Sequence, residues 1–161
     1  MKTLALTTLI AAGLALSSTT AFAALDEATK AALATCQASD SPPEKGIAAC
    51  TTVLTNVKMG PKNSLAIHYY RGAFYTKANN NEKAAADFTD AINAYEQDAD
   101  KANWPVDFIG LAASSYAFRA QTALAAKKCD DAKADYQKAA ATEREVSQRD
   151  EYEKIGRSIC K

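Results

Sequence analysis

The chain has few of the residues from which most catalytic and metal sites are built. It has one histidine, His68, and four cysteines, and no Cys-x-x-Cys pair is present. A Ser-His-Asp or Cys-His device would have to use His68, and no His or Cys pair has the close spacing of a zinc site. No acidic stretch follows the calcium-loop pattern. We therefore expect no catalytic residues, no cofactor and no bound metal.

An excess of charge of either sign is also missing. The chain carries 19 basic and 19 acidic residues. Nucleic acids and anionic membranes attract proteins with a concentrated positive field, so we expect neither as the main partner. Glycine and proline are few, with 6 and 4 residues, whereas alanine is abundant. Because alanine has the highest helix propensity, this composition predicts a single all-α domain.

The N-terminal segment has the pattern of a secretory signal peptide. Lys2 precedes a short apolar run from Leu4 to Leu16, and Ala21-Phe22-Ala23 has small residues at the two positions that a signal peptidase reads. The run is shorter than a membrane-spanning helix of about 20 apolar residues. We expect residues 1–23 to be a cleaved signal peptide and residues 24–161 to be a periplasmic domain of a Gram-negative bacterium, without a membrane span.

A spacing of small and aromatic residues in the middle of the chain predicts two packed helices. Gly72 precedes Tyr75 by three residues, and Ala84 precedes Phe88 by four. The small residues would let the two helix backbones approach, while Tyr75 and Phe88 would fill the space one turn further along. This spacing resembles the tetratricopeptide repeat (TPR), a helix-turn-helix unit of about 34 residues whose glycine, tyrosine, alanine and phenylalanine stand in the same order.

Segments on both sides repeat this order. Downstream, Ala120, Ala132 and Tyr136 keep the spacing, and upstream Ala34 and Gly46 keep it. The TPR resemblance therefore implies three helical hairpins in a short right-handed solenoid, closed by a C-terminal capping helix. The hairpins are expected at about residues 26–56, 63–98 and 106–141, and the capping helix at about 143–160.

The two repeat periods differ in length. The second-helix positions Gly46, Ala84 and Ala132 are separated by 38 and then by 48 residues. Both periods exceed the TPR length of about 34 residues. The extra residues of the second period are expected in an insert at 97–112, where Trp104-Pro105 should end one helix or begin the next.

The four cysteines allow three pairings. In an antiparallel hairpin, Cys36 near the end of one helix lies nearly level with Cys50 in the next. The third hairpin and the capping helix would bring Cys160 back beside Cys129. We expect Cys36–Cys50 and Cys129–Cys160 disulfides, formed in an oxidising compartment. Buried free thiols are the alternative.

The TPR resemblance implies a protein-interaction role. In that family the first helices of the repeats form a concave groove that holds a peptide. The lysine and asparagine with which some members clamp a carboxylate are replaced here by Ala31 and Thr35. We therefore expect a monomeric scaffold for a protein or peptide that is not a chaperone tail. The groove positions implied by the resemblance are Tyr69, Ala73, Thr76, Lys77, Gln121 and Leu124.

Two alternatives to a scaffold stay open. An assembly subunit of an envelope complex would use its outer face and termini in an oligomer. A small envelope enzyme or ligand carrier would hold His68 in a deep pocket with convergent acidic residues. The repeat position of His68 favours core packing instead. The mixed-charge run Glu143-Arg144-Glu145 is typical of a solvated helix face.

Overall fold

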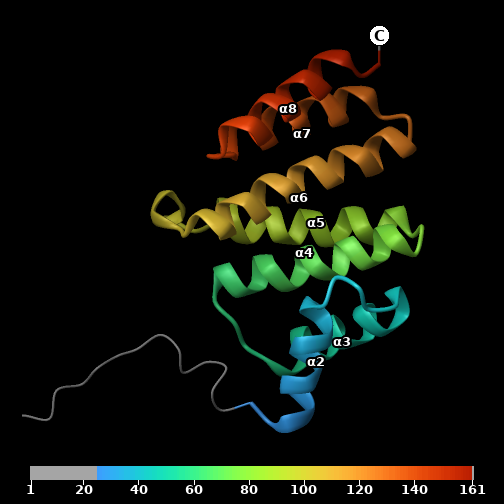
Figure 1. The fold of residues 1–161 in the computed structure, drawn as a ribbon, viewed down its shortest axis with the longest axis vertical. Coiled ribbons are helices and arrows are strands. Elements are labelled where there is room, and N and C mark those ends of the chain that lie inside the picture. Colours follow the sequence, from blue (N-terminus) through green and yellow to red (C-terminus); the bar gives the residue numbers. More distant parts are fainter. Residues whose placement is uncertain (1–24, 161) are drawn as a thin grey trace, which may run out of the picture.

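The computed structural model describes residues 25–160, which form helices and no strand (Figure 1). The all-α class is confirmed. The predicted signal peptide, residues 1–23, lies outside the described residues. Between residues 25 and 160, no helix is long and apolar enough to cross a membrane. The helices are α2 (Glu27–Gln37), α3 (Pro43–Asn56), α4 (Pro61–Lys77), α5 (Asn81–Glu96), the 3-10 helix η1 (Lys101–Asn103), α6 (Val106–Ala125), α7 (Cys129–Thr142) and α8 (Val146–Ser158).

Prolines and short polar residues set the ends of these helices. Pro43 and Pro61 occupy the first turns of α3 and α4, where a missing N–H removes no helical hydrogen bond. The Asn80 side chain caps α5 by accepting a hydrogen bond from the Lys83 amide at 3.2 Å. Asn79 has a left-handed backbone conformation, with φ of 56°, which asparagine tolerates. The breaks between helices are thus encoded locally.

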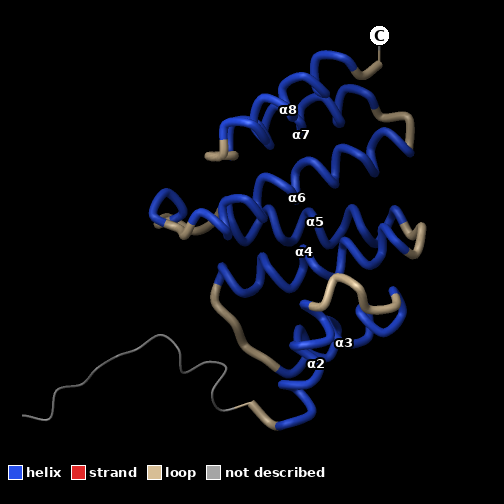
Figure 2. Tube along the Cα trace, viewed as in Figure 1, coloured by secondary structure: helices blue, strands red, loops and turns tan. Residues whose placement is uncertain are grey.

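The helices pack in pairs that follow one another along the chain (Figure 2). α2 packs on α3, α4 on α5, and α6 on α7, while α8 packs on α7. The first helices of neighbouring pairs also touch, because α4 contacts both α2 and α6. The pairs span residues 27–56, 61–96 and 106–142, close to the three ranges expected from the sequence.

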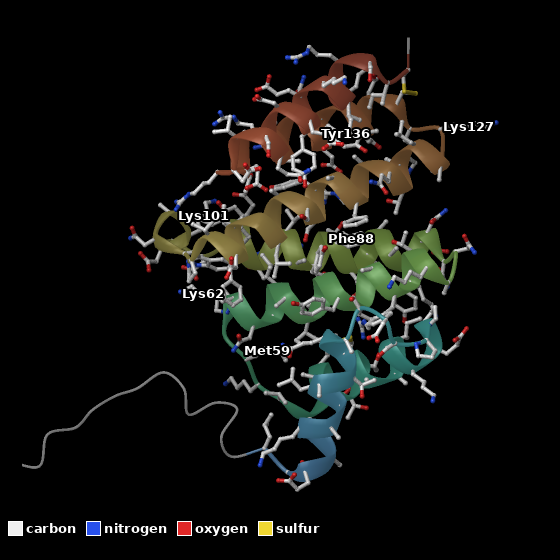
Figure 3. The ribbon with its side chains drawn as sticks, viewed as in Figure 1. Met59, Lys62, Phe88, Lys101, Lys127 and Tyr136 are labelled. Carbon is white, nitrogen blue, oxygen red and sulfur yellow. A yellow bond between two sulfur atoms is a disulfide. The ribbon has the colours of Figure 1, made fainter. Side chains whose placement is uncertain are left out.

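Two disulfides brace the ends of this stack. Cys36 is bonded to Cys50, with their Cα atoms 4.8 Å apart, and Cys129 is bonded to Cys160, with their Cα atoms 5.9 Å apart. This is the predicted pairing. The first bond joins α2 to α3, and the second joins the start of α7 to the residues after α8, where Figure 3 shows its sulfur atoms near the end of the chain. No described cysteine is free.

Small residues lie where helices approach closely. A Cβ atom at Gly72 would come within 2.9 Å of the Phe88 ring, which lies in the middle of the stack (Figure 3). A Cβ at Gly46 would overlap the Phe74 ring. The remaining predicted core residues other than Tyr75 are buried as expected, namely Ala84, Phe88, Ala120, Ala132 and Tyr136.

Tyr75 differs from the prediction. It is only half-buried, and the Lys83 ammonium lies 5.6 Å from the centre of its ring. Phe74, which is 2% exposed, fills the core position instead. The TPR spacing points to residue 75, but Phe74 faces the small surface of Gly46 on the preceding pair, and burial of its fully apolar ring there is more favourable.

Replacing Gly72 with leucine is expected to lower the free energy of unfolding by about 2 kcal/mol or more, because the new side chain would overlap the Phe88 ring. Chemical denaturation checks this value. Gly60→Leu is the matched control, since a Cβ at Gly60 would meet no atom within 4 Å. Equal effects of the two substitutions would contradict the close helix crossing at Gly72.

The insert at 97–112 forms a small core together with residues of α4 and α5, and it lengthens α6. Trp104 is 2% exposed and its indole N–H donates to Asp98 at 3.1 Å. Together with Ile109 it packs against Leu65 of α4. α6 begins at Val106, directly after Pro105, so the proline opens this helix. The last seven residues of the insert are therefore helical and belong to the first two turns of α6.

Candidate functional site

Two arginine–aspartate pairs connect the helix pairs with the same geometry. The Arg71 guanidinium donates to the Asp87 carboxylate from Nε at 2.8 Å and from Nη2 at 2.7 Å. Its Nη1 donates to Thr51 Oγ1 on α3 at 3.1 Å. Arg71 therefore links the α4–α5 pair to α3 of the preceding pair. The next pair has the same three bonds, at 2.8, 2.7 and 3.2 Å, formed by Arg119, Asp135 and Thr89.

These two networks are related by the two repeat periods of the sequence. Thr89 follows Thr51 by 38 residues, and Arg119 follows Arg71 by 48. In each network the aspartate lies 16 residues after the arginine. A shared register of three side chains in successive helix pairs is what an internal repeat produces.

His68 lies beside the first of these networks. Its Nδ1 is 3.0 Å from Asp87 Oδ1 and 3.8 Å from the Asp90 carboxylate, so the three side chains could in principle surround a metal ion. However, Arg71 already donates two hydrogen bonds to Asp87, and its fixed positive charge would oppose a cation there. The cluster is therefore better explained as an internal ion-pair network than as a metal centre.

The electrostatics of Asp87 fit that explanation. Burial alone would raise the pKa of its carboxyl, but hydrogen bonds from Arg71 and His68 outweigh the burial and hold the pKa below 3.8. His68 does not line any of the four hollows of residues 25–160 whose linings are considered below. Two acidic residues, Asp87 and Asp90, do converge on His68.

The first helices line a hollow of about 430 Å³ between α2, α4 and α6. The α4 residues recur at helical spacing, which places them on one stripe of that helix. Most of the lining is apolar, and it contains one carboxylate and no basic residue. The lining residues are Leu33 and Gln37 from α2, Asn63, Ala66, Ile67 and Tyr70 from α4, and Asp107, Phe108 and Leu111 from α6.

A second hollow, of about 420 Å³, continues the first toward α8. We call the two together the first-helix groove. Burial raises the pKa of Tyr152, so this phenol stays neutral, and its hydroxyl lies 3.5 Å from Ser114 Oγ. The second hollow shares Tyr70, Asp107 and Leu111 with the first and adds Gly110, Ser114, Glu143, Glu145, Gln148 and Tyr152.

Much of the first-helix groove is built by the insert. Four of its lining residues lie in the first two turns of α6, which are the helical part of the insert. The extra residues between α5 and α7 thus have a structural consequence, because they add helix where the two hollows meet. These four residues are Asp107, Phe108, Gly110 and Leu111.

Tyr69 does not line the groove, although the TPR resemblance pointed to it. Its ring lies 6.2 Å from Phe88 and 6.0 Å from Phe118, between ring centres. Burial raises the pKa of its hydroxyl. Adjacent helical residues point about 100° apart, so the neighbouring Tyr70 faces the groove while Tyr69 packs between helix pairs.

The other five predicted groove residues also lie outside the two hollows. Ala73 and Lys77 follow Tyr70 on α4 beyond the end of the first hollow, and the Lys77 ammonium donates to the Ser39 carbonyl. The Thr76 hydroxyl donates to the Gly72 carbonyl at 3.0 Å. On α6, Leu124 packs against the C-terminal core, while Gln121 is exposed.

Glu143 is a further difference from the sequence interpretation. It is 8% exposed and caps the end of α7, so it does not lie on a solvated helix face. Arg144 and Glu145 are exposed, as that interpretation expected. The spacing of apolar residues in the sequence does not predict that Glu143 is buried, because its burial depends on how α8 packs against α7. The sequence feature that could have pointed to the groove is the insert at 97–112, because its helical part lines both hollows.

We found no match to this chain among family models, curated proteins or solved structures. The function is therefore argued from the groove and the networks described above.

Proposed function

We propose that the protein is a TPR-like solenoid that works as a periplasmic interaction scaffold and holds a protein or peptide segment in the first-helix groove. In this proposal the three helix pairs are the repeats, α8 is the capping helix, and α2, α4 and α6 line the concave face. The repeated Arg–Asp–Thr networks, shifted by 38 and 48 residues, support the assignment of repeats.

The observation that carries the binding proposal is the continuity of the groove. Two hollows of about 430 and 420 Å³ meet at Tyr70, Asp107 and Leu111 and reach from α2 to α8. A long, shallow and mostly apolar surface suits an extended or helical peptide better than a small molecule, which is usually enclosed.

A larger hollow, of about 580 Å³, lies between α5, α6 and α7. We do not assign the partner to it. Its charged lining includes Arg119 and Asp135, which already satisfy each other with two hydrogen bonds. Breaking that pair to bind a ligand would leave a largely buried carboxylate without its partner.

The compartment is supported by the two disulfides. Disulfides form and persist in oxidising spaces such as the periplasm, and four paired cysteines within 25–160 are compatible with export. The pattern at residues 1–23 predicts the same route.

Site-specific photocrosslinking in the producing bacterium tests the binding proposal. A photoreactive residue at Tyr70 or Leu111 should yield an adduct with another protein. The same residue at Ala86, an exposed position of α5 outside these hollows, should yield none. Adducts formed equally at Ala86 would contradict the groove. Adducts only between copies of this chain would favour the assembly subunit instead.

A further inference from the structure

The second hollow of the first-helix groove contains a carboxylate with one oxygen held and one free. Glu143 is 8% exposed, and its Oε1 accepts hydrogen bonds from the amides of Arg144 and Glu145 at 2.8 and 3.0 Å. Within residues 25–160 its Oε2 has no hydrogen-bond partner, and no cation lies within 4.0 Å of it. Among the described residues, no buried side-chain nitrogen or oxygen lacks a hydrogen-bond partner, so Oε2 is open to solvent and can also be reached by a donor of a ligand.

The surroundings of Glu143 in this hollow are acidic. Asp107 and Glu145 also line it, and none of its lining residues is lysine, arginine or histidine. Arg149 lines a neighbouring hollow that shares Glu143 and Tyr152 with this one. Its charge attracts Glu145, but it forms no salt bridge with Asp107, Glu143 or Glu145, and its nearest carboxylate is Asp150 at 3.9 Å. Three carboxylates around one opening favour a positively charged occupant.

Gly110 also supports a ligand in this hollow. It lies in the second turn of α6, where glycine is less favourable than alanine. Packing within the chain does not require it, because a Cβ at Gly110 would meet only Glu143 Oε2, at 4.0 Å. A helical glycine without a packing reason is explained if a ligand approaches the backbone there.

Two exposed valines are sequence neighbours of residues that line the hollow. Among the described residues, the exposed large hydrophobic side chains are Val106 at 56% and Val146 at 55%. They stand next in sequence to Asp107 and Glu145, at the starts of α6 and α8. Acidic groups in the opening and exposed valines at the starts of the two helices that carry Asp107 and Gln148 together favour a positively charged group with apolar neighbours.

We propose that this hollow binds the side chain of a lysine or arginine in the partner peptide, with the cation bonded to Glu143 Oε2 and apolar residues of the peptide on either side. The inference rests on the proposed function. The aliphatic stem of the basic residue would pack on Tyr70 and Leu111 while its charged end reaches the carboxylate.

Peptide selection tests this proposal. The protein is used to select binders from a random dodecapeptide library, and the most enriched peptide is synthesised together with a version in which norleucine replaces its basic residue. Fluorescence anisotropy then gives the affinity of both peptides for the protein and for three variants. Melting temperatures show whether each variant is folded.

Glu143→Gln removes the charge but keeps an oxygen for the two amides, and we expect it to weaken binding by about tenfold or more. Gly110→Leu fills the hollow and should abolish binding without lowering the melting temperature. Glu151→Gln is the matched control, since it makes the same charge change at an exposed position outside these hollows, and it should leave the affinity unchanged.

The outcomes separate the two proposals. Enriched peptides with a basic residue, weakened by norleucine and by Glu143→Gln, support the inference. Selected peptides without a basic residue, or an unchanged affinity of Glu143→Gln, overturn the proposed lysine or arginine site. If Gly110→Leu still blocks these peptides, binding in the groove itself remains supported. If no peptide is enriched, or if Gly110→Leu binds normally, the cation site fails, and failure to select any peptide counts against the proposed function as well.

Discussion

Replacing Arg71 with methionine is expected to lower the free energy of unfolding by about 3–5 kcal/mol. The Asp87 side chain is 3% exposed, and two of its hydrogen bonds come from this guanidinium. Without Arg71, a buried carboxylate would keep only His68 as a partner. Chemical denaturation at neutral pH measures the loss.

The double variant Arg71→Met/Asp87→Leu is the informative control. Removing both charges and keeping the volume should restore most of the stability, because the cost lies in the unpaired charge. Arg157→Met breaks an exposed pair with Glu153 and should change the free energy of unfolding by less than about 1 kcal/mol. A double variant as unstable as Arg71→Met alone would contradict the ion-pair account.

The same pair predicts the direction of the pH dependence. The pKa of Asp87 is lower in the folded protein than its ordinary value of 3.8. The pair therefore contributes its full stabilisation above that ordinary value and loses it as the pH falls through the lowered folded pKa. The double variant should show a shallower loss of stability on acidification than the unmodified protein.

Replacing Phe88 with alanine is expected to lower the free energy of unfolding by about 3–5 kcal/mol. Phe88 is fully buried, its ring lies 5.4 Å from the stacked ring of Phe118, and it covers Gly72. Truncation would leave a cavity between α4, α5 and α6 that these rigid helices cannot close. Thermal and chemical denaturation should agree on the loss.

Tyr75→Ala is the control for Phe88→Ala. Since Tyr75 is half-buried and Phe74 fills the core position, its truncation should cost less than half as much. If Tyr75→Ala were as damaging as Phe88→Ala, the TPR spacing would describe the core better than the structure does.

The all-α class and the helix boundaries were predictable because their determinants are local. Prolines and asparagines at helix starts and turns fix the helix boundaries, and the small residues Gly72 and Ala84 mark where backbones approach. The Cys36–Cys50 pairing followed from helix lengths, since the two cysteines come level in an antiparallel pair of these helices. The Cys129–Cys160 pairing also needed the expected helix after the third hairpin, which brings the chain back.

The candidate site was less predictable because it depends on rotation and packing between helices. A rotation of one residue, about 100°, separates Tyr69, which packs against Phe88 and Phe118, from Tyr70, which lines the groove. The Arg71–Asp87 pair left a readable signal, since the same 16-residue spacing recurs at Arg119 and Asp135. Glu143 left none, because its burial arises only when α8 closes over α7.

The central claim is that a partner segment lies along α2, α4, α6 and α8, and an NMR titration of the labelled protein with the segment captured by crosslinking tests it most directly. The claim predicts that the largest shift changes occur at Tyr70, Leu111 and Tyr152, with Ala86 on α5 unaffected. Shift changes centred on α3, α5 and α7, with those three groove residues unmoved, would contradict it.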